Sequence, residues 1–235
     1  MIRSLNQAMR DITFERMFQS LKYRDFRLLW LGNAAHSASL WIEMVARPWL
    51  VLEITDGDAT MVGLMVATRA APSLLFGLFA GVLSDRFNRK YLLLAAKSSA
   101  FAISIAFVVL LALGYMELWV IFVFTFLRGS VMAFDQPARQ SLISQVVPVT
   151  MITNSVALMS STQSVMRVVG VLVSGLVIEL LGFTYIFGLV AFIYSGAVIA
   201  TALIKAETAN KSNKRPANSP RAIMTELVEG LRYGF

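Results

Sequence analysis

The stretch GVLSDRFNRKYLL, residues 81–93, separates two long apolar runs and places four charged side chains between them. They are Asp85, Arg86, Arg89 and Lys90. Three cations and one anion this close together cannot lie in hydrocarbon. The chain must therefore turn here, at a membrane surface where positive charge gathers. We call residues 81–93 the charged turn.

The composition of the whole chain indicates that its solvent is lipid. Of the 235 residues, 57% are hydrophobic and 15% are charged, which exceeds the apolar share of ordinary soluble domains. The formal charge of +7 would suit nucleic acid, but Lys and Arg gather at the ends of apolar segments instead of forming a stripe with aromatic residues. We therefore expect the lipid bilayer as a partner and no nucleic acid.

Six apolar runs follow one another, each near the length of about 20 residues that a helix needs to cross a bilayer. They are predicted at 27–51, 59–83, 91–113, 118–138, 153–180 and 183–204. The connections after the first, third and fifth runs lack Lys and Arg, whereas the charged turn, the 139–152 turn and both flanking regions carry them. The positive-inside rule then places both ends of this segment in the cytoplasm. We predict an all-α, multi-pass membrane protein.

The regions outside the runs differ from one another in composition. Residues 1–26 mix charges with apolar residues spaced along one helical face, which predicts a cytoplasmic amphipathic leader; a solvated leader is the alternative. Residues 205–221 have almost no apolar side chains and are typical of a flexible cytoplasmic linker. In 222–235, apolar residues recur every fourth position, which indicates the start of a second, missing bundle.

The first three runs are repeated in the last three. With an offset of 92 residues, the first run overlays the fourth, and both contain acid-x-x-Ala-Arg, at Glu43–Arg47 and at Asp135–Arg139. With an offset of 94, Gly81–Asp85 overlays Gly175–Glu179, where the basic residues that follow the first copy are missing. Repeats three helices apart face opposite ways in a membrane. We therefore predict six transmembrane helices arranged as two inverted three-helix repeats, residues 27–204.

Charged side chains at membrane depth cost about 2.5–3.5 kcal/mol each, so those that are kept usually face a cavity or a partner. The first run carries one polar stripe at helical spacing, composed of Asn33, His36, Glu43 and Arg47. We predict a water-filled cavity that favours anionic or carboxylate-bearing substrates, with Glu43 as a proton acceptor. The predicted cavity residues are His36, Glu43, Arg69, Arg128 and Arg167.

Other roles are open for some of these groups. Arg47 can pair with Glu43 one helical turn away, and the arginines can serve packing alone. Lys97 lies about 9 Å into the third run, so we expect it to snorkel to the cytoplasmic surface. Small residues at helix contacts allow close approach, which is the role expected for Gly77, Gly81, Gly170 and Gly175.

Nothing in the sequence indicates an enzyme. The chain has one histidine and no cysteine, and it lacks a Gly-rich phosphate loop and a carboxylate cluster with metal-ligand spacing. We therefore expect neither catalysis nor a bound cofactor or metal.

The charged turn resembles a loop of the major facilitator superfamily. Between helices 2 and 3 that family has Gly-x-Leu-Ala-Asp-Arg-x-Gly-Arg-Lys, and Gly81–Lys90 matches it except at Ser84 and Asn88. Asn is the non-glycine residue that best tolerates a left-handed backbone, so the departure at Asn88 is mild. The stretches FRLLW (26–30), PWL (48–50) and EGLR (229–232) are similar to the bacterial branch of enterobactin and macrolide exporters. The resemblance covers about residues 18–235, the amino-terminal half and the start of helix 7.

This resemblance implies a secondary active transporter of the cell inner membrane that works by alternating access. It implies efflux of small organic molecules, drug-like or anionic and siderophore-like, driven by a proton gradient and completed by a missing carboxyl-terminal bundle. Two alternatives are a truncated, non-transporting membrane module and the membrane domain of an ATP-driven exporter.

The resemblance also implies a conformational role for the charged turn. The residues concerned are Gly81, Asp85, Arg86, Arg89, Lys90 and, on the fourth helix, Asp135. We expect Arg89 to pair with Asp135, and Asp85 to face a helix of the missing half.

Overall fold

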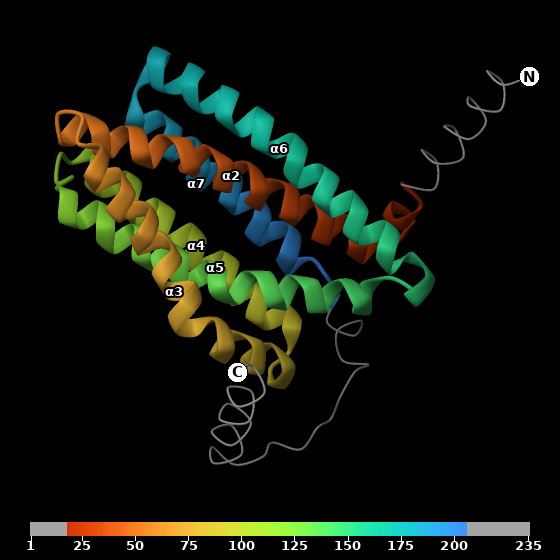
Figure 1. Cartoon of the computed structure of the whole chain (residues 1–235). Helices are drawn as coiled ribbons and strands as arrows, with labels where there is room; N and C mark the ends of the chain where they lie inside the picture. Colours follow the sequence, from red (N-terminus) through yellow and green to blue (C-terminus); the bar gives the residue numbers. More distant parts are fainter. Residues whose placement is uncertain (1–17, 206–235) are drawn as a thin grey trace, which may run out of the picture.

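The computed structural model describes residues 18–205, without the side chains of residues 78 and 80–86, and all its regular elements are helical (Figure 1). The long helices are α2 (Arg24–Ile54), α3 (Ala59–Arg86), α4 (Arg89–Ala112), α5 (Leu118–Val146), α6 (Ile152–Leu181) and α7 (Phe183–Ala202). Two short 3-10 turns, η1 (Gln19–Lys22) and η2 (Val149–Met151), precede α2 and α6. The all-α fold is confirmed. Most of the predicted leader and linker, and all of 222–235, lie outside the described residues.

Successive helices run in opposite directions, so the start of α2 and the end of α7 meet at one end of the bundle (Figure 1). The backbone N–H of Lys205 lies 3.5 Å from Oδ1 of Asp25. The start of α6 reaches the same end, where the Ser155 hydroxyl donates to Ser20 Oγ at 3.0 Å. We call this the basal end.

Five of the long helices contain a stretch apolar enough to cross a membrane. They are the helices from α3 to α7. The first predicted span, α2, does not reach this apolarity, although with 31 residues it is the longest helix described. Its polar stripe lowers the average, and those side chains are buried inside the bundle. Large apolar side chains such as Leu74, Leu172 and Phe192 instead face outward, as lipid requires. The chain is a multi-pass membrane protein.

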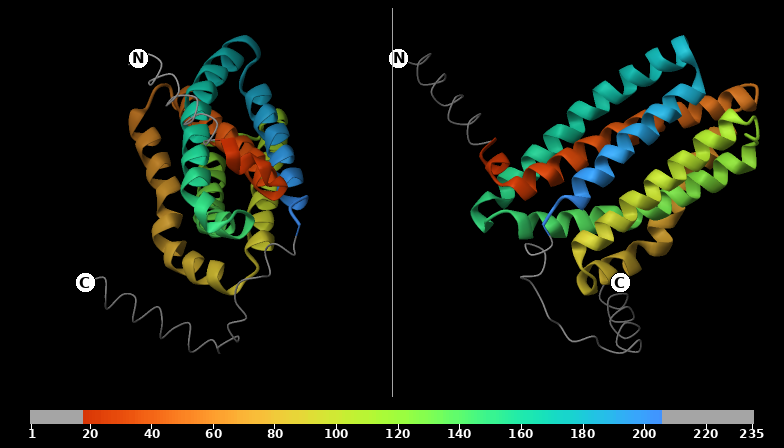
Figure 2. Two further views of the ribbon diagram at one scale, coloured as in Figure 1. Left: turned by 90° about the vertical axis from the view of Figure 1, so that its right-hand side faces the viewer. Right: turned by 180° about the vertical axis from the view of Figure 1, so that it is seen from behind.

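The packing of the helices reproduces the sequence repeat. α2 packs along α6 and α7, α5 packs along α3 and α4, and α4 lies against α7. Exchanging the first three long helices with the last three gives the same set of contacts. Figure 2 shows α3 and α6 on opposite sides of the other four helices. This is the arrangement expected of two inverted three-helix repeats.

Helix limits differ from the prediction at two places. α5 continues to Val146, so residue 139 is helical and not part of a turn. Leu142, Ile143 and Val146 extend the buried face of α5, and a membrane helix tolerates the internal Pro137. α2 begins inside the predicted leader, because Phe26 is fully buried in the apolar cluster at the basal end.

The charged turn connects two helices, as predicted, because α3 ends at Arg86 and α4 begins at Arg89. Asn88 does not use the left-handed backbone that Asn tolerates: its φ is −61°. The residue instead caps α4, since its side-chain oxygen accepts from the backbone N–H of Lys90 at 3.1 Å. This cap explains why Asn serves at a position where the family pattern has Gly.

Only one of the four predicted glycines is a described point of close contact. A Cβ at Gly170 would lie 2.8 Å from Cβ of Trp41, so α6 approaches α2 closely there. Gly129, which the sequence did not single out, closes the α5–α3 interface, where a Cβ would lie 2.4 Å from the carbonyl oxygen of Arg69. Within the described structure, Gly77 and Gly175 face open space, and the surroundings of Gly81 lie outside it.

Candidate functional site

Four polar contacts join α2 to α5, one after another along the two antiparallel helices. From the basal end they are Asn33 Oδ1 with Arg139 Nη1 (2.8 Å), His36 Nε2 with Asp135 Oδ2 (3.8 Å), Glu43 Oε2 with Arg128 Nε (3.0 Å), and Thr125 Oγ1 with Arg47 Nη1 (3.2 Å). All eight side chains are buried or nearly so. We call these contacts the charge ladder, and its α2 half is the polar stripe predicted from helical spacing.

The charge ladder has the symmetry of the sequence repeat. An offset of 92 residues exchanges its first contact with its fourth, and its second contact with its third. Two apolar sequences that were similar only by chance would not also have equivalent side-chain contacts in the folded protein. The ladder is therefore built twice by one three-helix unit, and each half contains one carboxylate.

The carboxylate of Glu43 is held by two arginines. Its Oε1 lies 3.3 Å from Arg47 Nη2 and its Oε2 lies 3.0 Å from Arg128 Nε. The guanidinium of Arg47 lies 4.8 Å from the ring centre of Phe107, which helps to satisfy a buried cation. We call Glu43, Arg47, Thr125 and Arg128 the Glu43 cluster. Because both oxygens are occupied by permanently charged groups, Glu43 is poorly placed for the predicted role of proton acceptor.

The carboxylate of Asp135 is surrounded by three basic groups. Oδ1 lies 3.1 Å from Lys97 Nζ, while Oδ2 lies 3.4 Å from Arg139 Nε and 3.8 Å from His36 Nε2. We call Asn33, His36, Lys97, Asp135 and Arg139 the Asp135 cluster. These distances are longer at Oδ2 than at Oδ1, so the carboxylate is held mainly through Lys97.

Two predictions about this region need correction. Lys97 does not snorkel to the surface: its side chain is 1% exposed, because Asp135 offers a buried counter-charge across the α4–α5 interface. The partner predicted for Asp135 is also different, since Lys97 occupies its Oδ1. Arg89 donates through Nη1 to the carbonyl oxygen of Ser141 at 3.1 Å, near the end of α5.

Tyr194 of α7 connects the two clusters. Its hydroxyl accepts from Nη2 of Arg128 and lies 3.4 Å from Nδ1 of His36. The guanidinium of Arg128 also lies 4.4 Å from the centre of the tyrosine ring. The side chain is fully buried. Sequence reasoning missed this residue, and the available signal was the pair Tyr194-Ser195 in the middle of a mainly apolar run.

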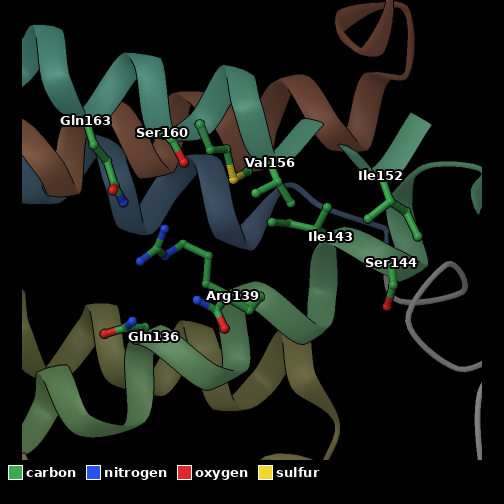
Figure 3. Close-up of a pocket in the computed structure, with 10 residues that line it drawn as sticks. Gln136, Arg139, Ile143, Ser144, Ile152, Val156, Ser160 and Gln163 are labelled. Carbon is green, nitrogen blue, oxygen red and sulfur yellow. The ribbon is translucent and has the colours of Figure 1, made fainter. Parts of the chain in front are cut away.

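A pocket of about 410 Å³ opens between α5 and α6 next to the Asp135 cluster. Its lining consists of Gln136, Arg139, Gln140, Ile143, Ser144, Ile152, Val156, Met159, Ser160 and Gln163. Figure 3 shows the guanidinium of Arg139 pointing into the space between the two helices, with the amide of Gln163 across from it. A second pocket, about 310 Å³, lies between α3 and α5 and shares Gln136 and Gln140.

The pocket thus presents one cation surrounded by neutral hydrogen-bonding groups. Arg139 belongs both to the pocket lining and to the Asp135 cluster, where it contacts Asn33 and Asp135. A ligand that reaches its guanidinium would therefore act directly on the charge ladder. The ten lining residues include no carboxylate that would compete for the arginine from the pocket side.

Two of the predicted cavity residues lie outside the charge ladder. Arg69 of α3 is partly buried and within electrostatic range of Glu43 and Arg128. Arg167 does not join the buried groups: it is exposed, with its guanidinium 4.5 Å from the ring centre of Trp41. Ser160 and Gln163, two turns and one turn before Arg167 on α6, line the α5–α6 pocket, but Arg167 does not.

The remaining residues of the charged turn are only partly described. Lys90 is buried, and its Nζ lies 5.9 Å from the ring centre of Tyr91. The side chains of Asp85 and Arg86, and the surroundings of Gly81, lie outside the described residues. Among the residues that the structure does describe, no cluster of three or more His, Cys, Asp or Glu has the geometry to hold a metal ion.

Comparison with known proteins identifies relatives along nearly the whole chain. Residues 16–234 match the family described as "Transmembrane secretion effector". The chain is 28% identical to the staphyloferrin A transporter of Staphylococcus aureus over 152 residues, which are 64% of this chain and 36% of that protein. It is 26% identical to macrolide efflux protein A of Streptococcus pyogenes over 216 residues, 89% of this chain and 52% of the relative.

The multi-drug resistance efflux pump PmrA of Streptococcus pneumoniae is also 26% identical over 216 residues, 90% of this chain and 51% of the pump. The chain therefore spans about half, or less, of the length of the curated relatives it matches. These relatives are named as transporters or efflux pumps.

Proposed function

This chain belongs to the transmembrane secretion effector family of the major facilitator superfamily, and we propose that it forms the amino-terminal half of a secondary exporter of small organic molecules. A second six-helix bundle completes the transporter, and the two bundles rock against each other to give alternating access. In this proposal the charged turn contacts the second bundle through Asp85.

The proposal for the substrate rests on one observation, the excess of positive charge inside the bundle. Between the helix ends, the described bundle holds five lysine and arginine side chains that are buried or partly buried, but only two carboxylates. The cations are Arg47, Arg69, Lys97, Arg128 and Arg139, and the carboxylates are Glu43 and Asp135. A cavity with this balance attracts anionic groups and repels cations. The exported molecules therefore carry a carboxylate or a similar anionic oxygen group.

The direction of transport follows from the proposed orientation of the bundle. The positive-inside rule places the basal end in the cytoplasm. The α5–α6 pocket lies toward this end, because α5 ends there and α6 begins there. A negative membrane potential favours the exit of an anion by about 2.3 kcal/mol per charge per 100 mV. In the proposed cycle, a proton binds to the empty carrier from outside, and the carrier then returns to the state that is open to the cytoplasm.

The test uses the complete transporter, that is, this bundle together with the second bundle of the proposal, in inverted inner-membrane vesicles. Three radiolabelled probes share a benzamide core: hippurate is an anion, its amide is neutral, and N-(2-aminoethyl)benzamide is a cation. We expect uptake of hippurate without ATP and its loss after addition of a protonophore. Uptake that needs ATP would indicate an ATP-driven exporter, and no uptake of any probe would contradict the proposal.

A pair of variants tests the charge argument. Arg128→Ala removes a buried cation of the ladder, whereas Arg167→Ala removes an exposed one. We expect Arg128→Ala to lower hippurate uptake by about 10- to 100-fold, the value of a charged hydrogen bond of about 1.5–3 kcal/mol. Arg167→Ala should leave it nearly unchanged. Equal transport of the neutral and anionic probes by both the wild type and Arg128→Ala would overturn the proposed substrate class.

A further inference from the structure

The charge ladder is symmetric in position but not in chemistry. The 92-residue offset places His36 of the Asp135 cluster on Arg128 of the Glu43 cluster. An arginine keeps its charge in proteins, whereas a histidine can gain or lose a proton near neutral pH. The charge of the Glu43 cluster is therefore fixed, and the charge of the Asp135 cluster depends on a proton at His36.

The hydrogen bonds around His36 have a definite direction. Arg128 can only donate, so its bond to Tyr194 uses an oxygen lone pair of the tyrosine. The hydroxyl proton of Tyr194 is then free to point at Nδ1 of His36, 3.4 Å away. A neutral imidazole that accepts at Nδ1 carries its own proton on Nε2. That nitrogen faces Oδ2 of Asp135.

The surrounding charges make the proton occupancy of His36 adjustable. The carboxylate of Asp135 beside Nε2 attracts a proton to the ring. Lys97 and Arg139, which share that carboxylate, and Arg128, which shares Tyr194 with His36, repel one. Arg139 holds Asp135 less firmly than Lys97 does, at 3.4 Å against 3.1 Å. Among the described groups, neither Nε of Arg139 nor Oδ2 of Asp135 makes a hydrogen bond of regular geometry. Arg139 is also the member that points into the α5–α6 pocket. A shift of Arg139 into the pocket would leave Asp135 Oδ2 to a protonated His36.

We propose that His36 is the proton-carrying residue of the transport cycle and that Tyr194 sets its neutral tautomer. A hydronium ion from the open side adds its proton to Nδ1 and leaves as water. The Tyr194 hydroxyl then rotates, so that it accepts from the imidazolium instead of donating to it. Nε2–H pairs with Asp135 in place of Arg139. This inference rests on the proposed transport function, but its first test does not require transport.

The first test measures the tautomer directly in the complete transporter in lipid nanodiscs. Histidine-selective ¹⁵N labelling gives ring nitrogen signals, and the signal missing from His36→Gln belongs to His36. We expect a neutral ring with its proton on Nε2 that becomes doubly protonated within about pH 5 to 8. Tyr194→Phe should remove the preference for this tautomer. A proton on Nδ1 in the neutral ring, or no change of protonation over this range, would refute the proposal.

The second test separates proton coupling from binding of the probe. In proteoliposomes, His36→Gln should lower hippurate accumulation driven by a pH gradient by about tenfold or more. Exchange of labelled for unlabelled hippurate without a gradient should stay within about twofold of the wild type. Ser195→Ala is the matched control, because this exposed hydroxyl next to Tyr194 bonds only the Phe192 carbonyl of its own helix among the described groups.

The outcomes distinguish this inference from the proposed function. Normal gradient-driven accumulation in His36→Gln would refute the role of His36 while leaving the exporter proposal intact. Failure of the wild type in both assays would instead contradict the exporter proposal, and the tautomer measurement would still test the hydrogen-bond arrangement. If His36→Gln loses both gradient-driven accumulation and exchange, the variant Tyr194→Phe tests the role of His36 instead. We expect Tyr194→Phe to retain exchange and to shift the pH at which accumulation is half-maximal.

Discussion

The Glu43 cluster and the Asp135 cluster are two copies of one arrangement, and they differ in how firmly their carboxylates are held. Both contain an acid and an arginine one helical turn apart, at 3.3 Å and 3.4 Å. The carboxylate of Glu43 is closed by two guanidinium groups, whereas that of Asp135 is shared by a lysine, an arginine and a histidine. One repeat unit thus provides a fixed ionic contact in one copy and a contact that responds to protons in the other.

Among variants of the two clusters, removal of Asp135 should cause the largest loss in the free energy of unfolding. Asp135→Ala leaves Lys97 and Arg139 buried without their carboxylate, and breaking a buried ion pair costs about 3–5 kcal/mol. We expect a clear fall in the thermal unfolding midpoint of the detergent-solubilised transporter. The double variant Lys97→Met with Asp135→Leu should recover much of this loss, because the buried ammonium group is removed together with its carboxylate and Arg139 keeps its bond to Asn33. A single variant as stable as the wild type would contradict the structure.

Removal of Glu43 should cost less than removal of Asp135, near the lower end of the range of about 3–5 kcal/mol for a broken buried ion pair, although it also leaves two cations behind. Arg128 keeps its contacts with Tyr194, and Arg47 keeps those with Thr125 and Phe107. The thermal unfolding midpoint of Glu43→Ala, measured in the same way, checks that its loss of stability is smaller than that of Asp135→Ala. A larger loss for Glu43→Ala than for Asp135→Ala would reverse the proposed difference between the two clusters.

The close helix contact beside the Glu43 cluster gives a third, smaller effect. Gly129→Ala places a Cβ against the backbone carbonyl of Arg69, and α3 must move away from α5. Overpacking of this kind typically costs about 1–3 kcal/mol. Gly175→Ala is the matched control, since nothing described lies within 4 Å of a Cβ there. Unchanged unfolding of Gly129→Ala would mean that the two helices are not in contact at this point.

The outer contacts of the ladder should give the smallest and most similar effects. Asn33→Ala and Thr125→Ala each remove one acceptor from a buried arginine that keeps its carboxylate. We expect each to cost about 1.5 kcal/mol, the lower end of the range for hydrogen bonds to charged groups. The Asn33 contact is shorter, 2.8 Å against 3.2 Å, so its loss should be slightly greater. Unfolding of the two variants under identical conditions measures the difference. If one variant lost several times as much free energy of unfolding as the other, the symmetry of the ladder would not extend to its ends.

Much of the fold could be predicted because it depends on local properties of the sequence. Apolar length located the helices, and helical spacing placed Asn33, His36, Glu43 and Arg47 on one buried face. The shared acid-x-x-Ala-Arg pattern indicated the repeat that the ladder displays. The prediction failed where a contact with another helix overrode the local pattern. Lys97 was expected near the surface, and α5 was ended too early, because neither Asp135 nor the buried face beyond Pro137 is visible from the run itself.

The choice of partners could not be predicted from spacing. Arg128 meets Glu43 across 85 residues of sequence, and Tyr194 meets His36 across 158. Arg167, like Arg128, is an arginine within an apolar run of the sequence. It nevertheless lies on the outside of the bundle, over the ring of Trp41. Which of these arginines faces the interior depends on the rotation of each helix against its neighbours.

The sequence by itself determined that this chain lies in a membrane, turns at the charged residues 81–93 and repeats a three-helix unit. These properties follow from the free energy of burying each segment in lipid and from the period of a single helix. Only the tertiary structure decided which charges share a carboxylate. That depends on the register between α2 and α5 and on the side chains that α4 and α7 add to them, Lys97 and Tyr194. The same repeat thereby gained a permanent charge in one copy and a histidine able to carry a proton in the other.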